Sequence, residues 1–284
     1  MAGVQQEVSL TAIREIRKNL RSAKGIAMCS LFFVFGAVPS VLQVLFTKAT
    51  ASAGLDNAPE QMLHEARVKA YTTIYDSADI GNYLAKCPDT LYVFLLEIAF
   101  LCLPVLVLLV GFDQIAGEIQ HRSIRYVVGR SRRTSFVVGK TLGLWAVVSS
   151  VMLLLHLTVW VVMLIRGSAP AGDVFSWGLR IWAFGVAYSA AWAGYTTLVS
   201  SLFRTPIVAM FVGAGVGSFL FVTYLVLRAI GERTEAFTWI FPNKYVWLMV
   251  SPDPSKALGG MALCIAWGAL CVLASTAIVR RRDI

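Results

Sequence analysis

Two ionisable side chains, Glu97 and His156, stand within long apolar stretches of this chain. Charge inside a bilayer is costly, so each is a functional candidate by default. Glu97 follows Asp89 by eight residues, roughly 12 Å of helix. His156 precedes Arg166 by ten residues, roughly 15 Å of helix. We hypothesise that the two side chains share a hydrogen bond at a similar depth. The alternatives are separate solvation in an outward cavity and a proton or substrate role.

A second possible chemistry is phosphate binding, because Gly139-Lys140-Thr141 resembles the end of a phosphate-binding loop. The motif GxxxxGK[ST] requires glycine where this chain has Thr134, and the intervening residues are bulky. HExxH, GxSxG and CxxC motifs are absent from the sequence. The sequence therefore predicts no enzyme: no catalytic residue, no metal ligand and no cofactor bound by this chain.

The elements that must position these residues are membrane helices. Hydrophobic residues make up 57% of the 284 residues, charged residues only 14%, and the mean hydropathy is +0.70, which excludes an ordinary soluble protein. We predict an all-α polytopic membrane protein, because six stretches reach the length of about 20 apolar residues that a span needs. These spans are residues 25–47, 90–112, 141–165, 181–203, 206–228 and 257–279. The first is too long for the apolar core of a signal peptide, so we interpret it as a permanent span.

The basic residues are divided unequally between the two sides of the predicted membrane. Fifteen Lys and Arg residues and five acidic residues fall on the side of the termini, whereas the opposite side has ten of each. Because loop Lys and Arg are retained in the cytoplasm, we expect both termini to be cytoplasmic. The excess basic charge lies beside the spans, where anionic lipid headgroups can neutralise it, so we expect no nucleic-acid partner.

Four further segments have distinct predicted roles. Residues 1–24 form an amphipathic helix at the membrane surface, with Val8, Ala12, Ile16 and Leu20 at four-residue steps. Residues 48–89 are the longest outer loop. Residues 237–250 are too apolar for a free loop and too broken by Pro242 for a span, so we expect short interfacial or re-entrant outer helices there, between spans five and six. Gly213 and Gly217 form a GxxxG pair for close helix packing, within the chain or in a dimer.

Residues 113–140 form a strongly basic joint between the second and third spans. Isoleucines at 115, 119 and 124 alternate there with charged residues. Such a helical stripe can rest on lipid and present its charges to a partner.

This joint resembles the signature of type 2 ABC transporter permeases. The resemblance covers the architecture of the whole chain and about 30 residues of motif, carried by Asp113, Glu118, Ser123-Ile124-Arg125, the basic turn Arg130–Arg133 and Gly139-Lys140. A proline often found in that basic turn is missing here. The resemblance implies that residues 25–284 form a six-span permease domain and that the joint is a coupling helix for a separate ATPase subunit. The ATPase-coupling residues would be Asp113, Glu118, Arg122, Ser123, Arg125, Arg130, Arg132 and Arg133.

The resemblance also implies partners and a location. The chain would pair with a cytosolic ABC ATPase, which holds ATP and Mg²⁺, and with a second permease copy or paralogue. It would lie in a bacterial cytoplasmic membrane and act as an exporter, as most members of the family do. Spans one, two and five would face the translocation path. The long outer loop suggests a docking surface for an accessory protein.

Two other functions are compatible with the sequence. An ion- or proton-coupled secondary carrier would bind its coupling ion at Glu97 and His156, although we find neither repeated halves nor matched broken helices. A membrane anchor or assembly factor of a cell-surface machine would use the outer loop for docking.

Overall fold

The computed structural model describes residues 3–23, several residues between 25 and 38, and residues 60–128, 131–167 and 169–282. The regular structure of this part of the chain is helical, without strands, which confirms the predicted all-α class. Most of the predicted first span and the beginning of the outer loop lie outside the described residues.

Five long helices build the molecule: α5 (Thr90–Gly111), α8 (Arg133–Arg166), α9 (Ala171–Leu202), α10 (Pro206–Ile230) and α13 (Pro254–Arg281). Four segments are long and apolar enough to cross a membrane: Thr90–Gln120, Arg133–Arg166, Pro206–Ile230 and Pro254–Arg281. These correspond to four of the six predicted spans. Helix α9 covers a fifth, residues 181–203, but does not meet the same criterion of hydropathy.

The low hydropathy of α9 follows from its position, because α5, α8 and α13 pack around it. Its fully buried residues include the hydroxyl side chains of Ser189, Thr196, Thr197, Ser200 and Ser201. Small residues also let α9 and α13 approach closely: a Cβ atom on Gly194 would lie 2.3 Å from the carbonyl oxygen of Gly268. Helix α9 therefore meets protein on most sides and needs less apolar surface than a lipid-facing span.

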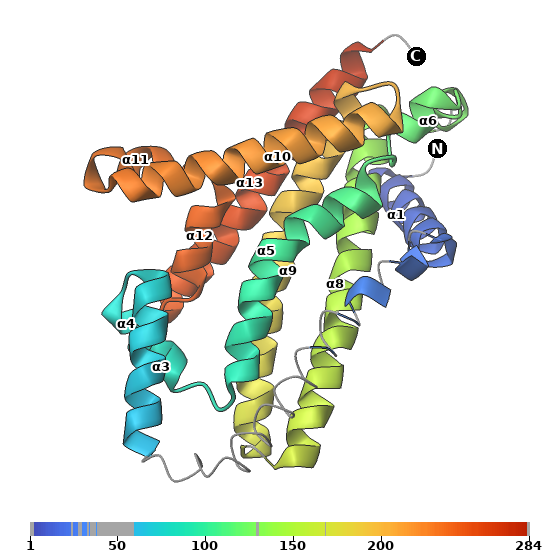
Figure 1. Cartoon of the computed structure of the whole chain (residues 1–284). Coiled ribbons are helices and arrows are strands. Elements are labelled where there is room, and N and C mark those ends of the chain that lie inside the picture. Colours follow the sequence, from blue (N-terminus) through green and yellow to red (C-terminus); the bar gives the residue numbers. More distant parts are fainter. Residues whose placement is uncertain are drawn as a thin grey trace.

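The helices are arranged as a bundle with one oblique member. Helices α5, α8 and α9 run alongside one another, whereas α10 crosses them obliquely (Figure 1). Both ends of the chain lie toward the same end of the bundle, which we call the terminal end (Figure 1); the opposite end, with the turn between α8 and α9, is the distal end. Only 11% of the most apolar window of α10 is buried, so this helix presents most of its apolar side chains outward.

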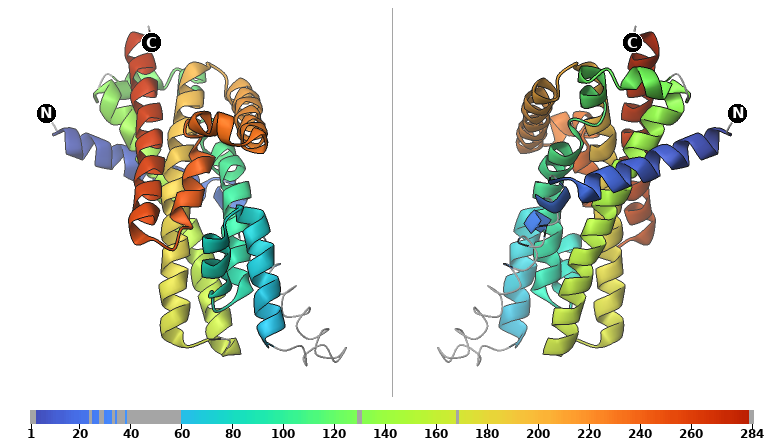
Figure 2. Two further views of the ribbon diagram at one scale, coloured as in Figure 1. Left: turned by 90° about the vertical axis from the view of Figure 1, so that its left-hand side faces the viewer. Right: turned by 90° about the vertical axis from the view of Figure 1, so that its right-hand side faces the viewer.

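Shorter helices occupy both ends: α1 (Val4–Arg21), α3 (Glu60–Tyr75), α4 (Ala78–Ala85), α6 (Ala116–Gln120), α7 (Ile124–Val128), the 3₁₀ helix η2 (Glu232–Thr234), α11 (Glu235–Thr238) and α12 (Pro242–Met249). Helix α1 extends crosswise to the bundle (Figure 2). The segment 237–250 is broken as predicted, and Pro242 starts α12, where a missing N–H costs nothing.

Two helix starts differ from the sequence prediction. Helix α8 begins at 133 rather than 141, and α9 begins at 171 rather than 181. The extra turns of α8 bury Ser135, Phe136 and Val137 beneath the joint, and those of α9 bury Val174 and Gly178. Apolar run length placed these starts too late, because Arg133 and Lys140 in α8 and Asp173 and Arg180 in α9 interrupt the apolar runs.

Candidate functional site

The basic joint between α5 and α8 contains two short helices rather than one continuous stripe. Helix α6 ends at Gln120 and α7 begins at Ile124. Arg122 between them has a φ of 57°, in the left-handed region, which a continuous α-helix does not contain. The prediction of a single helical stripe is therefore wrong, and the joint turns back on itself at residues 121–123.

The end of α9 holds the first corner of this joint. The amides of Ile115 and Ala116 both donate to Ser200 Oγ at 3.0 Å, and that hydroxyl donates to the carbonyl of Phe112 at 2.8 Å. One turn earlier on α9, Thr197 Oγ1 accepts from Gln114 Nε2 at 2.6 Å. The start of α6 is thus anchored to the bundle by hydrogen bonds to buried side chains.

A small apolar core lies under the joint. It consists of Ile115, Ile124, Phe136, Val137 and Val279, all at most 2% exposed. These residues come from the corner before α6, from α7, from the first turns of α8 and from the last turn of α13. A force on α6 or α7 would therefore reach the ends of α8 and α13 through direct packing.

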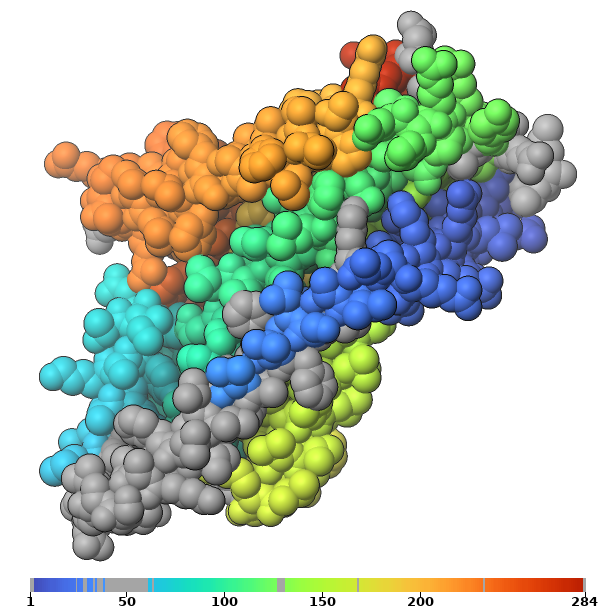
Figure 3. Space-filling view, turned by 45° about the vertical axis from the view of Figure 1, so that its right-hand side comes forward, coloured from blue at the N-terminus to red at the C-terminus, as the bar shows by residue number. Residues whose placement is uncertain are grey.

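Helix α1 lies against α8 (Figure 3). The face of α1 that is buried there is polar. Its most buried residues are Glu15 and Asn19, at 2% and 5% exposure, whereas Leu10, Ile13 and Leu20 are about half exposed. The predicted amphipathic helix is present, but its predicted apolar face is only half-buried at Val8, Ala12 and Ile16. Its outward apolar residues are left for lipid.

Two glycines of α8 allow α1 to approach. A Cβ atom on Gly139 would lie 2.6 Å from Cβ of Thr11, and one on Gly143 would lie 2.7 Å from Cβ of Glu15. Such contacts are too short for real side chains, so the crossing requires glycine at both positions. Residues 139 and 143 form a GxxxG surface that the sequence analysis did not identify.

A buried ion cluster joins α1, α6 and α8 at this crossing. Lys140 Nζ lies 2.6 Å from Glu15 Oε2 and 3.1 Å from Glu118 Oε1. The three side chains are only 4%, 2% and 10% exposed. The hydroxyl of Ser123 donates to the second carboxylate oxygen of Glu118. One ammonium thus bridges two carboxylates from different helices, and we call Glu15, Lys140, Glu118 and Ser123 the inner cluster.

The first turn of α1 contacts the start of α8 through a further hydrogen bond. The amide of Arg132 donates to Glu7 Oε2 at 3.1 Å. This hydrogen bond from the Arg132 backbone lowers the pKa of Glu7 below its usual value. Helix α1 is therefore held to α8 near both of its ends.

The predicted coupling residues differ in exposure and in the contacts that they make. Arg122, Arg125 and Arg132 are exposed at the terminal end, as is Tyr126, which is 81% exposed. Glu118 and Ser123 belong to the inner cluster, and Asp113 is half-buried at the end of α5. Arg130 lies outside the described residues.

Arg133 has a role within the chain that differs from the prediction. Its Nη1 donates to the carbonyls of Val279, Arg280 and Arg282 at 3.2, 2.7 and 3.0 Å. It therefore caps the end of α13, where a helix leaves unpaired carbonyls, and this role lies within the chain.

Glu15, Lys140 and Tyr126 were not among the predicted site residues. Glu15 and Lys140 are 125 positions apart, so no local pattern pairs them. The available signal was a four-residue period of polar residues on α1, at Glu7, Thr11, Glu15 and Asn19, facing the glycines of α8.

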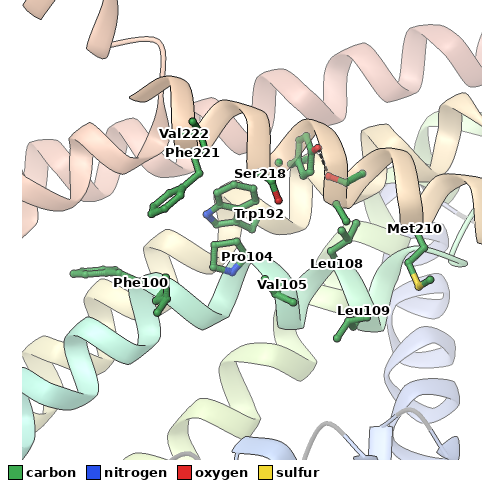
Figure 4. Close-up of a pocket in the computed structure, with 15 residues that line it drawn as sticks. Phe100, Pro104, Val105, Leu108, Leu109, Trp192, Met210, Ser218, Phe221 and Val222 are labelled. Carbon is green, nitrogen blue, oxygen red and sulfur yellow. Dashed lines mark hydrogen bonds between the residues drawn. The ribbon is translucent and has the colours of Figure 1, made fainter. Parts of the chain in front are cut away.

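A groove of about 380 Å³ lies between α5 and α10. Figure 4 shows Pro104, Val105, Leu108 and Leu109 on one wall, Met210, Ser218, Phe221 and Val222 on the other, and Trp192 of α9 between them. Gly213 is close-packed, since a Cβ atom there would lie 2.9 Å from Leu108 and 3.0 Å from Val199. Gly217 lines the groove, and a Cβ atom there would meet nothing closer than 3.7 Å, so within the described chain only Gly213 of the predicted GxxxG pair is close-packed.

The hypothesised bond between Glu97 and His156 is wrong. The carboxylate of Glu97 accepts from the hydroxyl of Tyr75. His156 Nδ1 lies 2.8 Å from the carbonyl of Met152, and its Nε2 has no hydrogen-bond partner in the described structure. Similar depth did not make the two side chains meet, because they point to different neighbours.

Comparison with known families gives one match: the model described as ABC-2 family transporter protein covers residues 10–248. The match includes α1 from residue 10 onward, the joint and the walls of the groove. A comparison with curated proteins gives no match.

Proposed function

Because the chain belongs to the ABC-2 family of transporter proteins, we propose that it couples ATP hydrolysis by a separate cytosolic ATPase subunit to substrate movement, in the direction of export. ATP and Mg²⁺ would be bound by that partner. Family members are membrane subunits of transporters and generally work with such an ATPase.

The observation that supports coupling is the inner cluster together with the exposed arginines beside it. Arg122, Arg125 and Arg132 present positive charge at the terminal end. An acidic groove on the ATPase would complement these charges and orient the encounter. The apolar core beneath α7 would then transmit the movement to α8 and α13.

The inner cluster would add α1 to the same moving unit. A buried ion pair loses much of its Coulombic energy when its partners separate in a low-dielectric environment. Glu15 of α1 and Glu118 of α6 share the ammonium of Lys140. We therefore expect α1, α6 and α8 to move together rather than slide past one another.

The proposed membrane arrangement has six spans, with residues 25–47 first and α9 fourth. The terminal end would face the cytoplasm of a bacterial cell, because most of the excess basic charge is there. A second copy or a paralogue would complete the transporter, and the groove between α5 and α10 would line its path.

A double charge reversal tests the proposal. In Arg125→Glu/Arg132→Glu the exposed surface would repel an acidic partner, so we expect at least a tenfold loss of ATPase association and of transport-coupled ATP hydrolysis. Membrane insertion and the elution profile of the permease should not change. The matched control is Lys69→Glu/Arg233→Glu, which reverses two exposed charges on α3 and η2. Normal association in the first variant would argue strongly against this coupling surface.

A further inference from the structure

The apolar groove continues into two more polar cavities. Phe100, Leu101 and Phe221 line both the groove and a neighbouring cavity of about 210 Å³. That cavity shares Tyr75, Tyr224, Arg228 and Trp247 with a third cavity of about 330 Å³. A molecule could therefore extend from an apolar environment between α5 and α10 to a polar one beside α3 and α12. We call the second cavity the distal cavity.

Glu97 is the acidic group of the distal cavity, and its carboxylate has no ion-pair partner among the described residues. Its hydrogen bond comes from the neutral hydroxyl of Tyr75. No ion pair to Glu97 is present among the residues that the structure describes. A carboxylate at this depth in a span is costly without a positively charged partner.

The cations near Glu97 are engaged elsewhere. The guanidinium of Arg228 stacks 3.9 Å from the centre of the Trp247 ring and donates to the carbonyl of Ile74 at 3.3 Å. Lys244, in the third cavity, forms an ion pair with Glu235 at 3.0 Å. Arg228 lines the same cavity as Glu97, but neither Arg228 nor Lys244 forms an ion pair with that carboxylate.

Aromatic rings form much of the distal cavity wall, beside aliphatic side chains and Asn243. Tyr75 and Trp247 meet edge to face, with ring centres 5.1 Å apart. Phe100 and Tyr188 form a second such pair at 5.3 Å, and Tyr224 also lines the cavity. Ring faces attract organic cations, and quaternary ammonium groups are commonly recognised by such aromatic walls.

We propose that the groove and the distal cavity together bind a cationic amphiphile, with its apolar body between α5 and α10 and its ammonium group beside Glu97. The proposal rests on the proposed function in that it assigns a substrate class to the transport path. Charge complementarity selects this ligand: an anionic headgroup would be repelled by Glu97, and an uncharged chain would leave the carboxylate unpaired.

The test measures binding in the absence of ATP and of any partner. The full chain is placed in phosphatidylcholine nanodiscs and titrated with trimethylammonium-diphenylhexatriene, a rod-shaped cationic probe. Energy transfer from tryptophan to the probe is recorded, and the signal from protein-free nanodiscs is subtracted. Neutral diphenylhexatriene and its anionic propionic acid derivative have the same body and report the effect of charge.

We expect saturable binding of the cationic probe, at least tenfold tighter than binding of the neutral and anionic probes. Glu97→Gln should remove that preference while leaving neutral-probe binding unchanged, which also shows that the variant is folded. Glu97→Asp, which keeps the charge, should retain binding within about threefold, and Asp173→Asn should have no effect because Asp173 is exposed at the start of α9.

Equal binding of the three probes, or an unchanged preference in Glu97→Gln, would overturn the proposal. Cross-linking that shows a second copy of the chain filling the groove would overturn it as well. The nanodisc titration contains no ATPase, so it tests the binding site separately from the proposed function. Charge-selective binding by a chain that associates with no ATPase would support the site and contradict the proposed ATP-driven transport. An ATPase partner without charge-selective binding would do the reverse.

Discussion

The two charged regions of the membrane bundle differ in how their charges are balanced. At the terminal end, Lys140 lies between Glu15 and Glu118 with both carboxylates within 3.1 Å. In the distal cavity, Glu97 has a hydroxyl donor but no cation among the described residues. In the inner cluster both carboxylates contact an ammonium of this chain, whereas Glu97 shares its cavity with Arg228 but forms no ion pair among the described residues.

This difference separates two uses of buried charge. A cluster that is complete within the chain holds helices in a fixed relation, which suits the transmission of a force. An incomplete site is stabilised by a ligand of opposite charge and contributes little to holding the fold together. The two regions should therefore respond in opposite ways to neutralising substitutions.

The largest effect is expected for Lys140→Met. Removal of the ammonium leaves two buried carboxylates facing each other, which costs about 3–5 kcal/mol. The midpoint of thermal unfolding in detergent should fall by roughly 10 °C. Lys69→Met is the control, because Lys69 is exposed on α3.

A second substitution separates charge balance from lost contacts. Glu15→Met/Lys140→Met removes one of the two carboxylates together with the ammonium, so only Glu118 stays buried without a cation, and the variant should recover part of the lost stability. A double variant as unstable as Lys140→Met would show that the pair itself, rather than the unbalanced charge, holds α1.

An intermediate effect is expected where α1 crosses α8. In Gly143→Ala the new methyl group would lie 2.9 Å from the carbonyl oxygen of Ala12. Overpacking of this kind costs about 1–3 kcal/mol, and displacement of α1 should make residues 4–21 more sensitive to limited proteolysis. Gly215→Ala, where a Cβ atom would meet nothing within 4 Å, should leave the digestion pattern unchanged. Equal digestion of both variants would disprove the close crossing.

The smallest effect is expected for Glu97→Gln. The glutamine keeps an acceptor for the Tyr75 hydroxyl and removes an unbalanced charge, so the free energy of unfolding should change by less than about 1 kcal/mol. Thermal unfolding of Glu97→Gln and Glu15→Gln under the same conditions measures the contrast. If Glu97→Gln were the more damaging change, the comparison between the two regions would fail.

The sequence predicted the helices better than their contacts. Apolar run length located four candidate spans, and Pro242 marked the break between α11 and α12. It did not indicate the full length of α9, because Asp173 and Arg180 interrupt the apolar pattern over the first ten residues of that helix.

The site was predictable only where residues near in sequence act together. The exposed arginines of the joint could be identified from local charge. The inner cluster could not, because its partners come from three helices and Glu15 lies on a helix whose apolar stripe suggested the opposite face. The pairing of Glu97 with Tyr75 was equally hidden, since Tyr75 ends a helix of the outer loop.

The most direct measurement is purification of the tagged chain from its native cells in mild detergent, followed by identification of bound proteins and an assay of ATP hydrolysis. We predict a stoichiometric nucleotide-binding subunit that is lost in Arg125→Glu/Arg132→Glu and retained in Lys69→Glu/Arg233→Glu. A folded chain that purifies without an ATPase and without ATP hydrolysis would contradict the proposed coupling of transport to ATP hydrolysis. It would favour an ion-coupled carrier.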